Sequence, residues 1–459
     1  MQLIVPLPMH GIGGAKDLPI PAEVAIAGAV AALTVSFIVL ALAWRTPRYD
    51  PATDGRPAPR WLALVVDSPW FAALARTVGL LVLGWAALAA VLGQDLLTNP
   101  FFGMFYVWLW VGLVPFSLLL GPVYKAINPL RTINLAFAKL SGSDPEVGVL
   151  RYPERLGYWP AAVGLFAFVW LELVYPYSTE LGPVRLWCAV YVAAMLLGGA
   201  LFGSTWFERA DPFEVYSSLV ARLSVWARRD GRLIIVSPLA NLNALSPAPG
   251  LVAVVAVLFG STAFDSFGDS ALWIRFLQTN PLVTGWDNAA YVADNLALLG
   301  FCVSVGLLFA LGTMLTGIGP DPENRTGWRA ALERRTHLPQ VFAHAIVPII
   351  VGYIVAHYLT YWFEVGQDTL IKASDPLTTG ADYLGTADLS VNYWLSYHPT
   401  LLAWTKVGGV VVGHVVGVIA SHERAIALLP KRYHLTGQLS LLVLMVFFTA
   451  GGLFLLFAA

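Results

Sequence analysis

Residues 22–44 read AEVAIAGAVAALTVSFIVLALAW, and residues 438–457 read QLSLLVLMVFFTAGGLFLLF. Each stretch holds about 20 almost wholly apolar residues, the length that an α-helix needs to cross the roughly 30 Å hydrocarbon core of a bilayer. Eight further stretches have the same character, so the sequence predicts an all-α, polytopic integral membrane bundle of about ten transmembrane helices. The predicted spans, numbered one to ten, are 22–44, 70–93, 100–122, 159–178, 182–203, 250–268, 290–317, 339–363, 400–421 and 438–457.

The composition differs strongly from that of a soluble domain. Hydrophobic residues make up 58% and charged residues 12% of the 459 residues, and the mean hydropathy is +0.69. The 17 Trp and 17 Tyr fit a protein with two membrane interfaces, where amphipathic rings concentrate. A net charge of −1 gives no indication of nucleic-acid binding. Cys188 and Cys302 lie in apolar stretches and are expected to be buried, inert thiols.

Basic residues predict the orientation of the helices. The segments after spans one, three, five, seven and nine contain 21 of the 27 Lys and Arg residues, whereas the opposite side has only Lys16, Arg185, Arg275 and Lys372. Cytoplasmic loops hold the excess of basic residues in membrane proteins. We therefore predict a bacterial cytoplasmic membrane protein with both termini extracytoplasmic. Residues 1–21 lack a basic n-region and are expected to form a short extracytoplasmic lead.

The segments after spans three and five resemble each other. Residues 121–141 read GPVYKAINPLRTINLAFAKLS, and residues 203–224 read GSTWFERADPFEVYSSLVARLS. Each copy predicts a helix exit followed by an amphipathic helix that begins at proline and lies on the cytoplasmic face. Residues 22–459 are thus predicted to form one transmembrane domain with an internal repeat, 100–178 and 182–268. Interfacial helices that resemble each other without duplication are the alternative.

Several polar side chains fall in the outer part of the spans. A charge inside a span costs about 2.5 to 3.5 kcal/mol on insertion scales, so it needs a partner or a watery cavity. One ammonium, one imidazole, one phenol and three carboxylates lie at similar depth and predict an outward-facing polar cavity. The alternative is a set of separate interfacial residues that contact water or headgroups. The predicted cavity residues are Glu172, Asp265, Asp294, Tyr353, His357 and Lys406.

Two histidines in the inner half of spans eight and nine form a second set. His344 and His414 would lie at nearly the same depth in neighbouring helices, and axial histidines on facing helices can clamp a haem iron. The alternative is that the two histidines are packed in the protein and form hydrogen bonds to backbone carbonyls or waters. A divalent metal held by His10, His357 and His398 with outer carboxylates is a further hypothesis. The cofactor therefore stays open between haem, a divalent metal and none.

A stripe of small residues runs along span nine. Gly409, Gly413 and Gly417 follow one another at intervals of four, which lets another helix approach closely. His414 lies about 100° round the helix from this stripe. A buried hydrogen bond near a tight helix contact would therefore also explain His414.

Several motifs of known chemistry are missing from the sequence. It contains no Gly-x-x-x-x-Gly-Lys-Ser/Thr loop, no His-Glu-x-x-His and no Gly-x-Ser-x-Gly. Nothing therefore indicates a nucleotide-driven pump, a zincin protease or an α/β-hydrolase nucleophile.

Seven stretches carry a resemblance to a known family. They are HGIGGAKDLPIP (10–21), GPVYKAINPLRTIN (121–134), SPLANLN (237–243), FGSTAFDSF (259–267), FAHAIVPIIVGYIVAHY (342–358), TADLS (386–390) and GHVVGVIASHERAIAL (413–428). The chain resembles a group of actinobacterial and proteobacterial multipass membrane proteins that are often labelled fenitrothion hydrolase. The resemblance covers most of the chain and implies an activity on an organophosphate ester. It assigns no catalytic residue.

Three classes of function follow from these observations. A secondary carrier or channel-like protein for a small solute or ion suits ten spans, repeat-like halves and sparse intramembrane charge best. A membrane-embedded hydrolase would need an activated water and positive charge near the phosphoryl oxygens. The third class is a haem- or metal-binding subunit of a membrane respiratory complex. The expected partners are the lipid bilayer and other membrane subunits, without nucleic acid.

Overall fold

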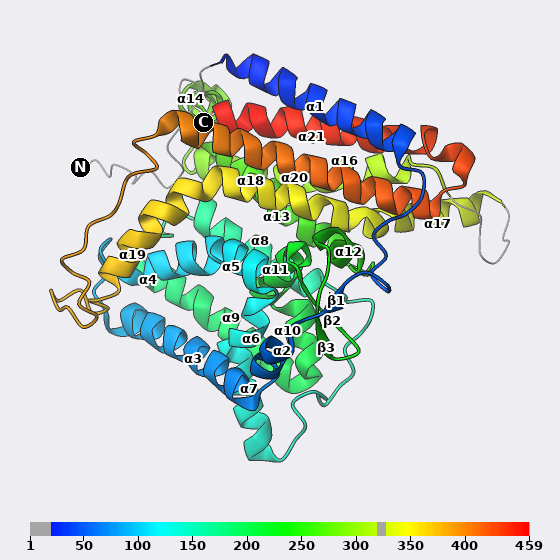
Figure 1. Cartoon of the computed structure of the whole chain (residues 1–459). Helices are drawn as coiled ribbons and strands as arrows, with labels where there is room; N and C mark the ends of the chain where they lie inside the picture. The colour runs from blue at the N-terminus through cyan, green and yellow to red at the C-terminus, as the bar shows by residue number, and fades with distance from the viewer. Residues whose placement is uncertain (1–19, 319–326, 459) are drawn as a thin grey trace.

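The computed structural model describes residues 20–318 and 327–458. The fold is 72% helical and has one small three-stranded sheet in the described part (Figure 1). The predicted lead, except residues 20 and 21, and His10 within it lie outside the described residues.

Eight of the helices in the described part are long and apolar enough to cross a membrane. Each coincides with one of the ten predicted spans, which supports a multipass membrane protein in contact with lipid. They are α1 (Ala22–Ala43), α3 (Pro69–Leu92), α9 (Leu181–Phe202), α13 (Leu251–Gly268), α16 (Ala289–Met314), the helix Trp328–Lys372, α20 (Pro399–Leu428) and the helix Thr436–Phe457, which contains most of α21 (Leu439–Ala458).

The other two predicted spans differ from straight membrane helices. The 100–122 segment comprises α4 (Pro100–Phe102), the π-helical η2 (Gly103–Val111) and α5 (Leu113–Leu120), with a 41° bend before α5. Pro115 lacks the N–H that would continue the hydrogen bonding across this bend. The 159–178 segment shortens to α8 (Trp159–Leu173), because Pro176 disfavours helix in the residue before it. Ten spans are therefore not established by helix length.

Span eight is much longer than predicted. Instead of 339–363, a continuous helix runs through α17 (Trp328–Phe342), η4 (Ala343–Ile346), α18 (Val347–Thr360), η5 (Tyr361–Val365) and α19 (Gly366–Lys372). The hydropathy pattern misses the α17 part because it contains three arginines and a glutamate, which are nevertheless good helix formers.

Short elements connect these helices. In chain order they are β1 (Arg56–Pro57), α2 (Arg60–Val66), α6 (Val123–Ile127), α7 (Pro129–Ser141), α10 (Ser204–Ala210), α11 (Pro212–Val220), η3 (Ala221–Leu223), β2 (Trp226–Arg229), β3 (Arg232–Ile235), α12 (Pro238–Asn243), α14 (Ala271–Thr279), α15 (Pro281–Thr284), η6 (Lys431–Tyr433) and η7 (Thr436–Gln438).

The two ends of the bundle carry different elements (Figure 1). The sheet, of antiparallel order β1-β3-β2, lies with α2, α7 and α17 at one end, which we call the predicted cytoplasmic end. Helices α14 and α19 lie at the other end, which we call the predicted outer end. Ile20 before α1 and Phe457 in α21 belong to one apolar cluster, so both ends of the described chain lie together.

The two repeat-like segments fold similarly at their starts but not throughout. Gly121 (φ 81°, ψ −154°) and Gly203 (φ 63°, ψ −153°) share a backbone conformation that glycine alone adopts readily. Asn128 and Asp211 then cap α7 and α11, each followed by proline. However, α11 is buried on nearly all sides, so it does not lie on the membrane face as predicted. The internal repeat itself stays a prediction.

Helices α13 and α18 occupy the centre of the bundle. Both are buried over most of their length, whereas α3, α9 and α16 are largely exposed on the outside, where lipid would contact them. α18 packs between α13 and α20, and α8 packs against α13. Polar side chains on α13 and α18 therefore face protein and not lipid.

Candidate functional site

A chain of hydrogen bonds joins α13 to α18. Asp265 Oδ2 lies 2.9 Å from His357 Nε2, and Ser266 Oγ lies 3.2 Å from His357 Nδ1. The Tyr353 hydroxyl donates to Ser266 Oγ at 2.8 Å, and the Tyr358 hydroxyl donates to Asp265 Oδ2 at 2.5 Å. We call these five residues the core network. Since an ionised carboxylate only accepts, Nε2 of His357 carries a proton and Nδ1 can accept the Ser266 proton.

Helical spacing explains how the core network forms. Tyr353 and His357 are four residues apart, so both side chains reach α13. Asp265 and Ser266 are adjacent on α13 and contact opposite nitrogens of one imidazole. All five residues are buried, with at most 5% of their surface exposed. The network therefore satisfies its own polar groups within the protein, as buried polar groups require.

Glu172 of α8 lies beside the core network and is itself buried. Its carboxylate interacts electrostatically with Tyr358 and with Tyr106, Tyr216 and Tyr361, which lie on three other helical segments. The structure thus brings Glu172, Asp265, Tyr353 and His357 of the predicted cavity into one region, and this region is a packed core of buried residues.

Asp294 lies on α16 and Lys406 lies on α20. Trp273 Nε1 donates to Asp294 Oδ1 at 2.8 Å, which links α14 to the start of α16. Lys406 is buried on α20, 3% exposed, three residues before Gly409. Gly409 packs against Gly352 of α18, on a face about 100° from that of Tyr353. Lys406 therefore approaches α18 from the α20 side, whereas Asp265 approaches from the α13 side.

The inner histidines lie at different depths. The two ring nitrogens of His344 lie 3.1 Å from the Val341 carbonyl oxygen and 3.3 Å from that of Ala420. His414 Nδ1 donates to the Val410 carbonyl oxygen at 2.9 Å. Ala420 follows His414 by six residues, about 9 Å along the helix axis. Because carbonyls engage both His344 nitrogens and the rings are offset, this pair does not fit the two axial ligands of one haem iron.

The residues present also give no preformed metal site. Within residues 20–318 and 327–458, no three or more His, Cys, Asp or Glu side chains come together as a metal ion would require. His357 is engaged by Asp265 and Ser266, and His398 Nδ1 donates to the Trp394 carbonyl oxygen at 2.7 Å. The third proposed ligand, His10, lies outside the described residues.

The glycine stripe lies against α18 and η4. A Cβ atom at Gly413 would lie 2.6 Å from the Pro348 carbonyl oxygen, and one at Gly417 would lie 2.7 Å from that of Ala345. On the other side, a Cβ atom at Gly352 would lie 2.4 Å from the Gly409 carbonyl oxygen. Such distances leave no room for a side chain, so the stripe sets the close approach of α20 to the helix that carries the core network.

A second cluster of buried polar residues lies where α7 and α11 begin. The sequence did not indicate this cluster as a site. Asn128 Nδ2 donates to Asp211 Oδ2 at 2.9 Å and to Glu214 Oε2 at 3.0 Å. Arg131 pairs with Glu214 Oε1 at 2.7 Å and donates to Ser204 Oγ at 2.9 Å. We call Asn128, Arg131, Asp211 and Glu214 the α11 acidic cluster. The repeated Asn/Asp-Pro motif was its only sequence signal.

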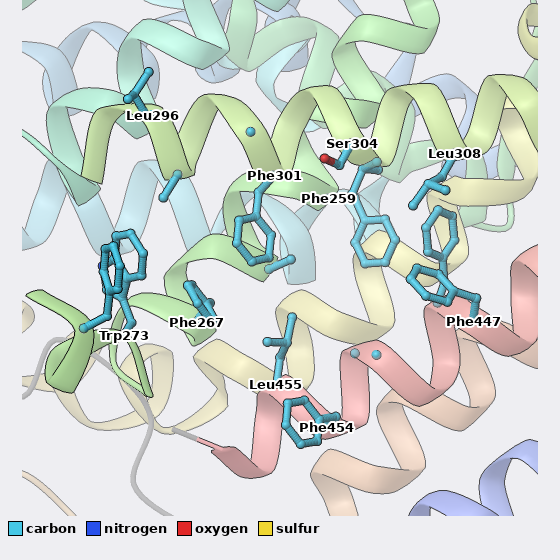
Figure 2. Close-up of a pocket in the computed structure, with 18 of the residues that line it drawn as sticks. Phe259, Phe267, Trp273, Leu296, Phe301, Ser304, Leu308, Phe447, Phe454 and Leu455 are labelled. Carbon is cyan, nitrogen blue, oxygen red and sulfur yellow. The ribbon is translucent and has the colours of Figure 1, made fainter. Parts of the chain in front are cut away.

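An apolar groove of about 750 Å³ opens between α16 and α21, over α13 (Figure 2). Aromatic rings project into it from all three helices, among them Phe259, Phe301 and Phe447. Gly452 lies in the wall of this groove, next to the Tyr353 ring. A Cβ atom at Gly452 would lie 3.3 Å from this ring, so glycine leaves room for it. Tyr353 therefore separates this groove from Ser266 in the core network.

Comparison of the chain with protein-family models, curated proteins and solved structures finds no significant match. The class of the protein, a multipass helical membrane protein, rests on the apolar helices.

Proposed function

We propose that this protein moves a small solute or ion across the membrane, with protons passing through the core network. The observation that supports this proposal is the unbroken hydrogen-bonded chain from Tyr353 through Ser266, His357 and Asp265 to Tyr358. This chain lies inside helices that are long and apolar enough to span a bilayer. Placing ionisable groups inside membrane spans costs free energy, and in membrane proteins such groups often belong to proton relays.

The charge of the Asp265 and His357 pair depends on one proton. With a neutral imidazole the pair carries one negative charge, and uptake of a proton by His357 makes it neutral overall. Glu172 is buried beside the pair and provides a second carboxylate with which a proton can be exchanged. Reversible protonation without loss of packing is the property that a proton-coupled carrier needs.

Proton uptake by reconstituted vesicles tests the proposal. The purified full chain is placed in liposomes that contain a pH-sensitive dye, and a potassium diffusion potential, negative inside, is applied with valinomycin. We expect wild-type vesicles to acidify faster than protein-free vesicles. Asp265→Asn and His357→Gln remove the titratable groups at nearly constant size and should slow uptake by about tenfold or more.

Asp294→Asn is the matched control for this experiment. It makes the same carboxylate-to-amide change in a neighbouring helix, and its amide oxygen can still accept from Trp273. We expect this variant to retain wild-type uptake. Wild-type vesicles that acidify no faster than protein-free ones, or Asp265→Asn vesicles that match wild type, would refute proton movement through the core network.

One observation favours hydrolysis as a second candidate function. Ser266, His357 and Asp265 have the hydrogen-bond order of a nucleophile, a base and an orienting carboxylate. The imidazole is turned relative to the usual triad, with Nδ1 towards serine. The apolar groove behind Tyr353 offers a lipophilic ester a route from the bilayer. This would suit the organophosphate activity that the family resemblance implies.

Covalent labelling separates the two candidates. An organophosphate that phosphorylates serine nucleophiles should label wild-type protein at Ser266 and leave Ser266→Ala unlabelled if the protein is a hydrolase. Transport alone predicts no labelling of either protein, because the Ser266 hydroxyl then serves only as a hydrogen-bond partner of Tyr353 and His357.

A further inference from the structure

Helix α11 carries two members of the α11 acidic cluster, Asp211 as its N-cap and Glu214 in its first turn, and it contacts α18 of the core network. It has nine residues, eight of them buried, and it packs against α5, α8 and α18. Asp211 at its N-cap and Glu214, Tyr216 and Ser217 within it are buried, and burying polar groups costs free energy unless they are hydrogen-bonded or paired. Their positions form a series of steps across the protein.

The first step connects the surface to the carboxylates. Lys125 and Glu208 form an exposed ion pair with a 2.6 Å distance at the predicted cytoplasmic end. Arg131, with 19% of its side chain exposed, lies 4.0 Å from Glu208 and 2.7 Å from Glu214, which is itself buried. One partly exposed arginine therefore separates Glu214 from water at this end.

The second step leads from the carboxylates into the helix. The Tyr191 hydroxyl donates to Asp211 Oδ1 at 3.1 Å and lies 3.4 Å from the Tyr124 hydroxyl. Ser217 follows Glu214 by three residues, so the two share one face of α11. Its Oγ lies 2.8 Å from Ser117 Oγ of α5.

The third step ends at Glu172. Tyr216, next to Ser217, packs its ring on Trp110 with centroids 4.8 Å apart. Its buried hydroxyl has no hydrogen-bond partner among the residues that the structure describes, yet it interacts electrostatically with Glu172. A buried hydroxyl without a described hydrogen-bond partner is unusual in proteins. It can still form a hydrogen bond to a group that brings or takes a proton. Glu172 in turn interacts with Tyr358 of the core network.

We infer that α11 is the connection through which protons pass between the predicted cytoplasmic end and the core network, with Asp211, Glu214 and Tyr216 as its carriers. This inference rests on the proposed function and adds the path to it. Each transfer is balanced: a carboxylate takes up one proton from the cytoplasmic side and releases one towards Glu172. The tyrosine and serine hydroxyls accept one proton as they give up another, so they end each transfer unchanged.

The surroundings of Asp211 suit this role. Burial, and next the nearby Glu214 carboxylate, raise the pKa of Asp211 to about 7. The groups that face it are Glu214 on its own helix, Asn128 before α7, Arg131 on α7, Tyr191 on α9 and Tyr124 on α6. An acid with this pKa is protonated below and ionised above neutral pH, so it can both bind and release a proton under ordinary conditions.

The test uses the same vesicles with three variants, Asp211→Asn, Glu214→Gln and Tyr216→Phe. Tyr216→Phe is the sharpest, because it removes only a hydroxyl that has no described hydrogen bond. We expect it to slow proton uptake by about 100-fold, the lower end of the typical contribution of a proton-transfer group. Wild-type uptake should also fall as the pH rises through about 7, because fewer Asp211 carboxyls then carry a proton, and Asp211→Asn should abolish this inflection.

Asp67→Asn is the control at the same end, since Asp67 pairs with Arg228 on the surface and lies outside the path. It should leave uptake unchanged. If wild type conducts, Asp265→Asn is blocked and Tyr216→Phe conducts normally, the inferred path is wrong while the proposed function stands. If wild type does not conduct, the proposed function itself is wrong.

Discussion

The residues of the core network position one another through hydrogen bonds, and two of these bonds stabilise the charge of Asp265. Asp265 accepts from both His357 and Tyr358, so its negative charge is spread over two donors that belong to the same helix. Such charge-assisted hydrogen bonds are stronger than neutral ones. Removing one partner of a buried charged pair costs several kcal/mol because the other group stays buried and uncompensated. Isosteric changes are therefore the informative ones here, since they keep the packing.

Lys406 is the charged residue whose substitution we expect to affect function most. It is a buried ammonium in the central layer of the bundle, within α20 and close to α18. We expect Lys406→Met to abolish proton uptake by vesicles while the amount of folded protein stays near wild type, because charges inside membrane spans are usually functional and methionine removes the charge while keeping an unbranched, flexible side chain. Lys406→Arg should restore little, since a planar guanidinium does not replace a compact ammonium.

Wild-type uptake by the Lys406→Met protein would show that Lys406 only fills space or extends towards the interface. Equal loss of folded protein in both variants, measured by size-exclusion chromatography in detergent, would assign Lys406 a structural role.

At the scale of elements, the contact between α20 and α18 depends on glycine. The pattern of small residues at intervals of four predicts that some helix comes close, but it cannot say which one, because the partner is chosen by the whole fold. The structure shows α18 as that partner, and through it the stripe supports the core network.

Gly413→Ala tests this packing. The added methyl group would lie 2.6 Å from a backbone oxygen, so the two helices must separate. Overpacking of this kind costs about 1 to 3 kcal/mol. We expect a lower midpoint of thermal unfolding in detergent, followed by tryptophan fluorescence. Gly408→Ala is the matched control on the same helix, because a Cβ atom there meets no other atom within 4 Å. Equal midpoints for both variants would contradict the proposed contact.

The elements differ in how far the sequence predicts them. Long apolar runs such as Ala22–Ala43 are set by local hydropathy, and the bounds of α1, α3 and α9 agree with the prediction within one residue, whereas α20 continues seven residues beyond its predicted end. The core network is not local. His357 and Asp265 are 92 residues apart, and Ser266 and Tyr358 were missed because nothing in the sequence says which face of α13 meets α18. The burial of α11 was missed for the same reason, since its amphipathic pattern resembles that of a membrane-surface helix.

At the scale of the whole molecule, the number of crossings is constrained by the ends of the chain. Ile20 and Phe457 pack in the same apolar cluster, so the described chain starts and finishes at one end of the bundle. An even number of crossings is then required, either the eight long helices alone or these together with both the bent 100–120 segment and α8. Nine crossings, in which only the bent segment is added, would place the two ends on opposite sides.

Cysteine labelling decides between eight and ten crossings. If α8 crosses, the exposed residues Ser143, before α8, and Thr179, after it, lie on opposite sides of the membrane. We expect Thr179→Cys to react with a membrane-impermeant maleimide in intact cells, and Ser143→Cys to react only after the membrane is permeabilised, because basic loops stay in the cytoplasm. The unmodified protein is the background, as Cys302 is buried and Cys188 is partly buried. Labelling of both positions from the same side would show that α8, whose 15 residues span only about 22 Å, does not cross, and it would remove Glu172 from the spans.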